Sequence, residues 1–182
     1  MDMNNVIGHL KTVNHHRWLV MKSCFQVGLF RQGLLHDLSK YGYTEFHIGA
    51  RYFQGNRSPN NAEREAAGYS SAWLHHKGRN KHHYEYWIDY AIGPQKGMTG
   101  MKMPVNYVVE MVMDRIAASK TYLKGEYTDA KPLEYYMHGK AYDIIHEDTR
   151  ELLERLLKML AAHGERKTFA YIRNHVLKYS DY

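Results

Sequence analysis

Apolar residues recur at every third or fourth position over three long stretches of the chain, and this spacing is typical of helices with one buried face. Each stretch is followed directly by a glycine, the residue that most often ends a helix. The stretches are residues 4–27, 105–124 and 147–163. The sequence therefore predicts three long amphipathic helices.

Shorter helices are predicted between and after these three. Thr44 is a candidate N-cap, and Ser58-Pro59 is a strong helix start because proline is favoured at the first helical position. The predicted ranges are 45–53, 59–68, 70–76 and 167–178. Residues 93–104 contain three glycines and two prolines, so we expect a loop there, and this loop is a candidate lid. No stretch predicts a strand.

Together these elements predict an all-α fold, a compact helical bundle with one domain over residues 1–182. That length is sufficient for one hydrophobic core. We expect a metal-site core over about residues 4–124, with C-terminal helices over about 132–180 packed on it. The leucine stripe of residues 152–160 is most simply part of the core, and a homodimer contact is its alternative use.

The composition is that of a globular chain, with 44% hydrophobic and 24% charged residues. No apolar run is long enough for a membrane span and residues 1–20 lack the apolar segment of a signal peptide, so we expect a cytoplasmic protein without membrane contact. Cys24 is the only cysteine, which excludes an internal disulfide and a zinc site of several cysteines. The net charge of +6 favours anionic partners.

Residues 33–40, GLLHDLSK, present a neighbouring imidazole and carboxylate at the end of an apolar run. A nitrogen donor beside an oxygen donor suits a divalent transition metal (Mn, Fe, Co, Ni or Zn) better than Ca or Mg. Side chains of neighbours on a helix point about 100° apart, so His36 and Asp37 reach one cation only if their helix borders a cavity. The leucines expected to hold this helix against the core are Leu34, Leu35 and Leu38. A surface pair that closes a helix is the alternative.

Two further positions have the residue types that such a metal needs. His16 shares a helix face with Val20 and precedes His36 by 20 residues, a distance at which antiparallel helices bring such positions together, so we prefer it to His15. Its alternative role is that of a core histidine bonded to a carbonyl. Asp114 lies in the middle of an apolar helix, where a carboxylate is costly to bury without a cation. Its alternative is a salt bridge at the rim of the helix.

Residues 75–83, HHKGRNKHH, contain four histidines and three cations. Trp73 lies three residues before His76 and Trp87 four residues after His83, so we expect these two histidines to point inward as ligands. The residues expected to face substrate or water are His75 and His82, and those expected to hold phosphate are Lys77, Arg79, Lys81 and Lys40. An exposed basic loop is the alternative.

The order His, His-Asp, His, His, Asp resembles that of the HD-domain superfamily of metal-dependent phosphohydrolases. Residues 34–40 match its apolar-His-Asp-x-x-Lys element, and residues 113–116, MDRI, match its late aspartate helix. The resemblance covers about residues 4–122. The chain departs from the family at Ser39, where glycine is common, and in its paired histidines around Arg79. As a whole it also resembles a bacterial family of uncharacterised proteins.

The resemblance implies an all-helical fold and a first metal site made by His16, His36, Asp37 and Asp114. It also implies that Asp37 bridges to a second ion near His76 and His83, with Asp37 and Lys40 as catalytic residues. The implied activity is hydrolysis of a phosphate ester, such as a small nucleotide, by a metal-activated water. Three alternatives are a dimetal (Fe/Mn) oxygenase or peroxide-handling enzyme, a basic nucleic-acid-binding module, and a metal-free interaction domain.

Overall fold

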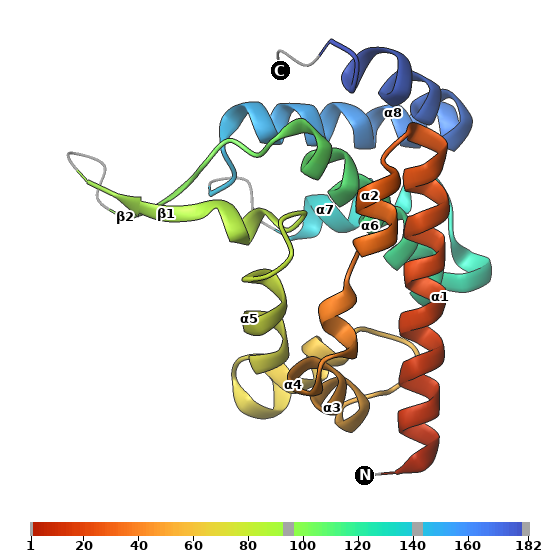
Figure 1. Ribbon diagram of the computed structural model, residues 1–182, viewed down its shortest axis with the longest axis vertical. Helices are drawn as coiled ribbons and strands as arrows, with labels where there is room; N and C mark the ends of the chain where they lie inside the picture. Colours follow the sequence, from red (N-terminus) through yellow and green to blue (C-terminus); the bar gives the residue numbers. More distant parts are fainter. Residues whose placement is uncertain (1, 93–96, 140–143, 180–182) are drawn as a thin grey trace.

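A computed structural model describes residues 2–92, 97–139 and 144–179, and the described residues form an all-α fold with one small hairpin (Figure 1). The α-helices are α1 (Met3–Val27), α2 (Phe30–Leu35), α3 (Tyr43–Arg51), α4 (Pro59–Ala67), α5 (Ser71–Lys77), α6 (Val105–Leu123), α7 (Lys131–His138) and α8 (Glu147–Tyr171). Shorter helical turns are η1 (Leu38–Tyr41), η2 (Tyr84–Trp87), η3 (Lys124–Glu126) and the π-helical η4 (Ile172–Val176). The predicted fold class is confirmed.

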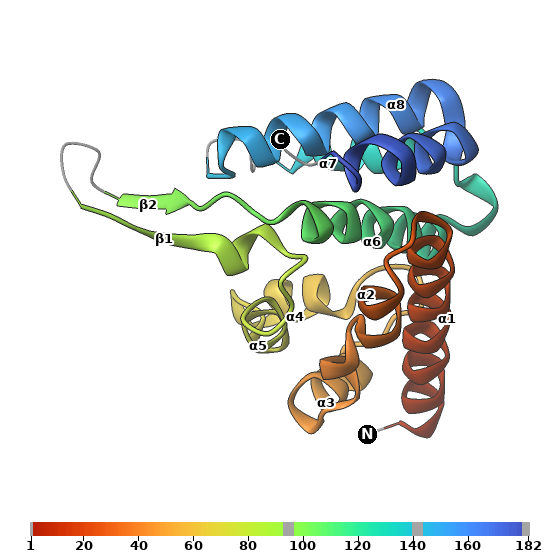
Figure 2. The ribbon, with the colours of Figure 1, turned by 45° about the horizontal axis from the view of Figure 1, so that its top comes forward.

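Helix α6 lies at the centre of the fold. Its six consecutive residues from Val108 to Met113 are all buried, so other parts of the chain cover it on almost every side. It packs against α1 and α8, and Figure 2 shows α7 and α8 on one side of it and α2 to α5 on the other. One hydrophobic cluster contains residues of all three long helices, among them Val20, Val112 and Leu156. Within the described ranges, no helix combines the length and apolar character that a membrane crossing needs.

Helix α1 has the predicted range and well-formed ends. The Asp2 side chain accepts a hydrogen bond from the Asn4 amide at the N-terminus, and Gly28 takes a left-handed conformation with φ 94° at the C-terminus. Such a φ is unfavourable for any residue with a Cβ atom, which explains the glycine. Its buried stripe contains His9 and His16 among apolar residues, so two histidines face the interior of the protein.

Helix α8 forms as predicted, as two segments that meet at a kink. Gly164 has φ 75° and ψ 170°, outside the helical region, and separates the segment predicted over 147–163 from the one that follows. The stripe from Leu152 to Leu160 is at most 1% exposed, so it belongs to the core of the chain. These leucines are therefore not available for a contact between two copies.

The helices α4 and α5 begin at the predicted serines. Ser58 precedes the proline at the start of α4, and the Ser70 side chain accepts a hydrogen bond from the Trp73 amide at the start of α5. The buried Glu63 carboxylate accepts from the Ser70 hydroxyl at 2.5 Å and from the Ser71 amide at 3.0 Å. Glu63 therefore fixes α4 against the N-terminus of α5, where a negative charge is favourable.

Two predictions about the chain before α4 are wrong. Helix α3 begins at Tyr43, with Gly42 rather than Thr44 as its N-cap. The leucines expected in the core are instead largely exposed: Leu34 at 55%, Leu35 at 52% and Leu38 at 47%. The reason is that α2 has only six residues and is held to α1 mainly through the buried Gly33, whose missing side chain brings it close to Cys24 and Phe25.

The loop prediction for 93–104 is also wrong in part. Ile88–Ala91 (β1) and Gly97–Gly100 (β2) form an antiparallel hairpin in which Ile88 pairs with Gly100 and Ala91 with Gly97. The hairpin extends away from the helices (Figure 1). A Cβ atom at Gly100 would collide with the backbone at 144–146, so glycine is required where β2 approaches that segment. The prediction that residues 93–96 belong to a lid lies outside the described residues.

His9 is a buried histidine without a role in the predicted site. Its ring lies between α1 and α3, with centroids 5.2 Å from Phe46 and 6.1 Å from Phe53, and its Nδ1 has no hydrogen-bond partner among the described residues. Burial, together with the charge of Lys40, lowers the pKa of His9 to about 4. The folded protein therefore resists protonation of His9, whereas the unfolded chain accepts a proton near pH 6.5.

We expect His9→Leu to remove part of the acid sensitivity of the protein. Because the folded pKa lies below the unfolded one, the stability contributed by neutral His9 is present above pH 6.5 and is lost as the pH falls towards 4. Between pH 7 and pH 5 the wild type should lose about 2 kcal/mol that His9→Leu keeps, as measured by urea denaturation at both pH values. The exposed His15→Leu is the control, and equal pH dependence in all three proteins would contradict this prediction.

Candidate metal centre

His36 and Asp37 lie in a turn between α2 and η1, not on a helix as predicted. His36 has extended backbone angles, φ −51° and ψ 127°, and Asp37 is left-handed with φ 53° and ψ 27°. Arg17 holds the turn because its guanidinium donates to the carbonyl of His36 at 2.7 Å and to that of Leu34 at 3.1 Å. Aspartate tolerates the left-handed region better than most residues. This conformation lets both neighbouring side chains point into the protein, where they are at most 2% exposed.

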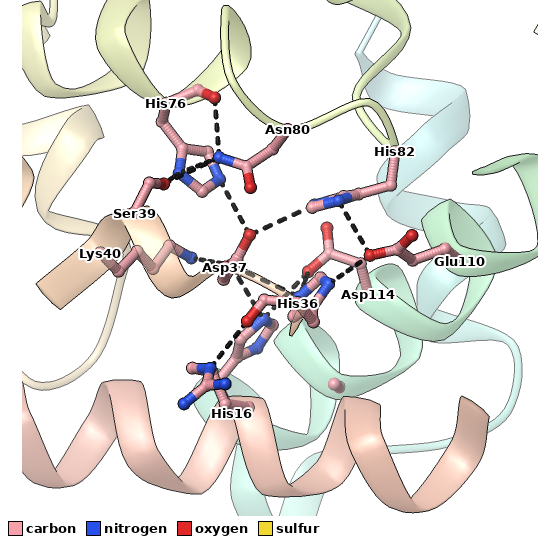
Figure 3. Close-up of polar contacts among 12 residues, drawn as sticks. His16, His36, Asp37, Ser39, Lys40, His76, Asn80, His82, Glu110 and Asp114 are labelled. Carbon is pink, nitrogen blue, oxygen red and sulfur yellow. Dashed lines mark hydrogen bonds and ion pairs between the residues drawn. The ribbon is translucent and has the colours of Figure 1, made fainter. Parts of the chain in front are cut away.

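A first group of ligand atoms forms around the Oδ2 atom of Asp37. His36 Nε2 lies 3.4 Å from this oxygen and His16 Nε2 lies 3.8 Å from it. Asp114 Oδ1 lies 3.0 Å from His16 Nε2 and 3.6 Å from His36 Nε2. The structure thus brings together the four residues of the predicted first site, which come from α1, the turn and α6 (Figure 3).

A second group forms around the other oxygen of the same carboxylate. Asp37 Oδ1 lies 3.2 Å from His76 Nε2 and 3.4 Å from His82 Nε2, and the Nε2 atoms of His76 and His83 are 2.9 Å apart. His76 and His83 were predicted to point inward, and the structure places both here. His82, which we expected to face substrate, also belongs to this group and is 2% exposed. The turn after α5 brings all three histidines to one side of Asp37.

Several of these atoms are buried without a hydrogen-bond partner. Among the described residues, the buried side-chain atoms without one include Nε2 of His16, His36 and His82 and both oxygens of Asp37. An unsatisfied buried polar atom costs about 1–3 kcal/mol. These atoms lie close together without meeting hydrogen-bond geometry, as expected of ligand atoms arranged around a common point. The donor set therefore fits a bound cation, and three imidazoles with carboxylates suit a transition metal.

Two carboxylates outside these two groups contact the histidines, and one of them, Glu110, forms a third possible ligand group with His36 and His82. Glu110 Oε1 on α6 lies 2.9 Å from His36 Nδ1 and 3.2 Å from His82 Nδ1. Glu45 on α3 lies 2.7 Å from Nδ1 of both His75 and His76, one oxygen to each. A ligand histidine usually donates its second ring N–H to such a carboxylate, which fixes its tautomer and orientation. His75 therefore pairs with Glu45, rather than facing substrate as predicted.

The electrostatics of the site favour ionised carboxylates and added positive charge. Burial alone would raise the pKa of Asp37, but the neighbouring His36, Lys40 and His76 hold it well below its usual value. Burial opposes a charge on His36, yet Asp37, Asp114 and Glu110 outweigh it and raise the pKa of His36 to about 10. The carboxylates thus create a negative field strong enough to keep a buried imidazole protonated. A divalent cation is the alternative way to neutralise that field.

Of the four cations expected to hold phosphate, Lys40 lies at the centre. Its Nζ is 2.7 Å from Asp37 Oδ2 and its side chain is 29% exposed. Arg79 instead donates to the carbonyl of His75, and Lys81 lies over the rings of Tyr86 and Tyr107. Burial raises the pKa of Glu85, and the charge of Lys77 opposes this rise only weakly. The geometry therefore leaves Lys40 as the cation that directly faces the metal ligands.

The matched part of the chain contains the whole centre. Residues 5–159 match a family described as a family of unknown function, DUF5662. The chain belongs to the DUF5662 family. No curated protein and no solved structure matches it. The matched range of this DUF5662 protein includes all seven residues of the two ligand groups.

We expect His36→Ala and Asp37→Ala each to abolish metal binding, because each removes a ligand that no neighbour replaces. Asp114→Asn should weaken binding, since the amide keeps the shape and loses the charge. Elemental analysis of protein purified without a chelator or a metal-binding tag measures the effect, with far-UV circular dichroism as a check on folding. His15→Ala, on the exposed neighbour of His16, is the control. Unchanged metal content in both His36→Ala and Asp37→Ala would refute the centre.

Glu45→Gln should weaken the second group of ligands while the first is retained. The amide cannot accept from both His75 and His76 as the carboxylate does, and loss of such an outer partner costs about 10- to 100-fold in metal affinity. Metal titration followed by calorimetry should then show one tight event and one weakened event. The exposed Glu65→Gln on α4 is the matched control. Loss of both events, or of neither, would contradict the separate role of Glu45.

Proposed function

We propose that this DUF5662 protein hydrolyses a phosphate ester, such as a small nucleotide, with one or two divalent transition-metal ions bound at the Asp37 centre. The observation that carries the proposal is the position of the Asp37 carboxylate. Each of its oxygens faces a different group of histidines, and neither has a geometric hydrogen bond among the described residues, although Oδ2 forms an ion pair with Lys40 at 2.7 Å. This is the arrangement expected of a carboxylate that bridges two cations. The resemblance to HD-domain phosphohydrolases in residues 34–40 and 113–116 supports the same reading.

A bound divalent cation would lower the pKa of a coordinated water and neutralise phosphate oxygens. The residues of the chain would supply the ligand atoms and hold them in position. Asp37 and Asp114 provide anionic oxygens. Burial is the largest single effect on each carboxylate and would raise its pKa, but the neighbouring histidines and, for Asp37, Lys40 together hold the pKa well below its usual value. His16 and His83 have lowered pKa values, caused first by burial, so both are neutral and able to bind metal. Glu110 and Glu45 keep the histidine rings oriented.

Lys40 is placed to hold the phosphate. Burial alone would lower its pKa, but Asp37 and Asp114 outweigh that effect and raise it, so Lys40 is fully charged. The Lys40 side chain is 29% exposed and that of Asp114 is 17% exposed, whereas the other side chains of the first group are at most 8% exposed. A phosphate that reaches the centre from this side meets the ammonium at the same point as the metal ligands. Lys40 is therefore the proposed phosphate-binding and catalytic cation.

The proposal includes a small anionic substrate and a cytoplasmic location, which suits a protein whose single cysteine, Cys24, is a free and buried thiol. Nucleic-acid binding is not favoured because Arg79 bonds to the carbonyl of His75 within its own segment and Lys81 lies over the rings of Tyr86 and Tyr107. A redox reaction at bound iron or manganese is the second candidate. It is favoured by the histidine-rich donor set, since imidazole suits iron well.

We expect Lys40→Ala to reduce kcat/KM for a phosphate ester by about tenfold to a thousandfold, the effect of losing one or two charge-assisted contacts. Metal content should not change, because Lys40 is not a metal ligand. The double variant Arg79→Ala/Lys81→Ala is the control and should keep nearly full activity, since both side chains contact groups outside the centre. Steady-state kinetics over a panel of nucleotides and sugar phosphates measures both.

If Arg79→Ala/Lys81→Ala loses activity and Lys40→Ala keeps it, residues 75–83 hold the phosphate and Lys40 does not. Activity unaffected by either change would leave the cations of both segments without a role in catalysis. If metal-loaded protein hydrolyses none of the phosphate esters but iron-loaded protein consumes oxygen or peroxide, the hydrolase proposal is wrong and the redox candidate replaces it.

A further inference from the structure

A hollow of about 480 Å³ lies between α1, the segment after α3 and the C-terminal end of α6. Its wall includes Lys11 and His15 of α1, Phe53, and Lys120 and Lys124. Thr12, one turn before His16 on α1, also lines the hollow, but no residue of the two ligand groups does. The hollow and the metal centre thus have no lining residue in common.

The wall of this hollow is strongly basic. Its lining has three lysines and no carboxylate. Lys120 forms an ion pair with Glu165, but within residues 2–92, 97–139 and 144–179 neither Lys11 nor Lys124 has an ion-pair partner. Two unpaired ammonium groups from different parts of the chain therefore line one concave surface. Such a surface attracts a multiply charged anion.

The backbone at Lys124 is strained. This residue has φ 51° and ψ −116°, a conformation that only glycine adopts readily, although Gly125 is the next residue. Strain of this kind persists only where the surrounding structure holds it, and it clusters at functional sites. A helix usually ends with glycine in the left-handed conformation. Here Lys124, which lines the hollow, takes a positive φ instead of Gly125.

Phe53 adds a rigid aromatic wall. Its ring packs so closely on Gly8 of α1 that a Cβ atom there would collide with it. The ring is therefore fixed in place without a ligand, which reduces the entropy cost of stacking a planar group on it. A volume of about 480 Å³ is that of a site for a ligand of nucleotide size.

We propose that this hollow binds a nucleoside phosphate, with the phosphates on Lys11 and Lys124 and the ring of the base against Phe53. The proposal is independent of the proposed hydrolase activity because it uses none of the metal ligands. A further hollow, of about 550 Å³ between the end of α1 and α8, is not a comparable site. It is lined by Glu165 as well as Arg166 and Arg173, so its charges are mixed.

Calorimetric titration of chelator-treated protein with ADP at about 50 mM salt tests the proposal, since removal of metal silences the Asp37 centre and low salt limits screening. Wild-type protein should bind ADP with saturation. The double variant Lys11→Gln/Lys124→Gln should lose about tenfold to a hundredfold in affinity. The double variant Lys22→Gln/Lys178→Gln makes the same change in net charge outside the hollow and should change affinity less than about twofold. Pyrophosphate should bind at least about tenfold more weakly than ADP because it has no ring.

Lys124→Gly separates this role from a merely structural one. Glycine relieves the strained backbone, so the melting temperature should rise by about 2 to 4 °C while ADP affinity falls. No saturable binding of ADP up to about 10 mM, or equal weakening in both double variants, would overturn the proposal. A rise in melting temperature with unchanged ADP affinity would also overturn it, because Lys124 would then contribute nothing to the ligand.

Discussion

The structure depends on one buried carboxylate, that of Asp37, which has no hydrogen bond to either oxygen among the described residues. A buried charge is tolerated only when opposite charge surrounds it. Here Lys40 forms an ion pair with Oδ2, four histidines lie within 3.8 Å of the two oxygens, and the raised pKa values of His36 and His76 favour positive charge on those two rings. Those histidines belong to α1, to the turn after α2, to α5 and to the segment after it. The need to compensate one carboxylate therefore determines how five parts of the chain meet.

Helix α6 serves the core and the centre at once. One side of it supplies apolar residues such as Val112 and Ile116 to the cluster shared with α1 and α8. Another side carries Glu110 and Asp114, one turn apart, towards the histidines. The charged residues are thus anchored on the most buried helix in the fold, which limits their movement. Rigid placement of this kind is what a metal site requires, because ligands that are loosely held bind weakly.

The parts of this arrangement that the sequence could predict are those with a local pattern. The ranges of α1, α6 and α8 follow from apolar spacing and from their closing glycines, and Asp114 is visible as a carboxylate among apolar neighbours. The role of Glu45 has no such signal, because its partner His76 lies 31 residues away and the two meet only through the packing of α3 on α5. His82 was misassigned because helical spacing was applied to a segment that the structure shows as a turn.

The exposed leucines after α1 and the inward turn of Asp37 have a common cause. Had His36 and Asp37 continued α2 as a helix, Leu34 and Leu38 would have shared a face one turn apart, and only one of the two polar side chains could have faced the core. The left-handed backbone of Asp37 ends the helix and directs both polar side chains inward, which leaves the leucines in solvent. The chain thus loses the free energy of burying apolar surface here. Metal binding by His36 and Asp37 together must therefore contribute more free energy than burial of Leu34 and Leu38 in a continuous helix would.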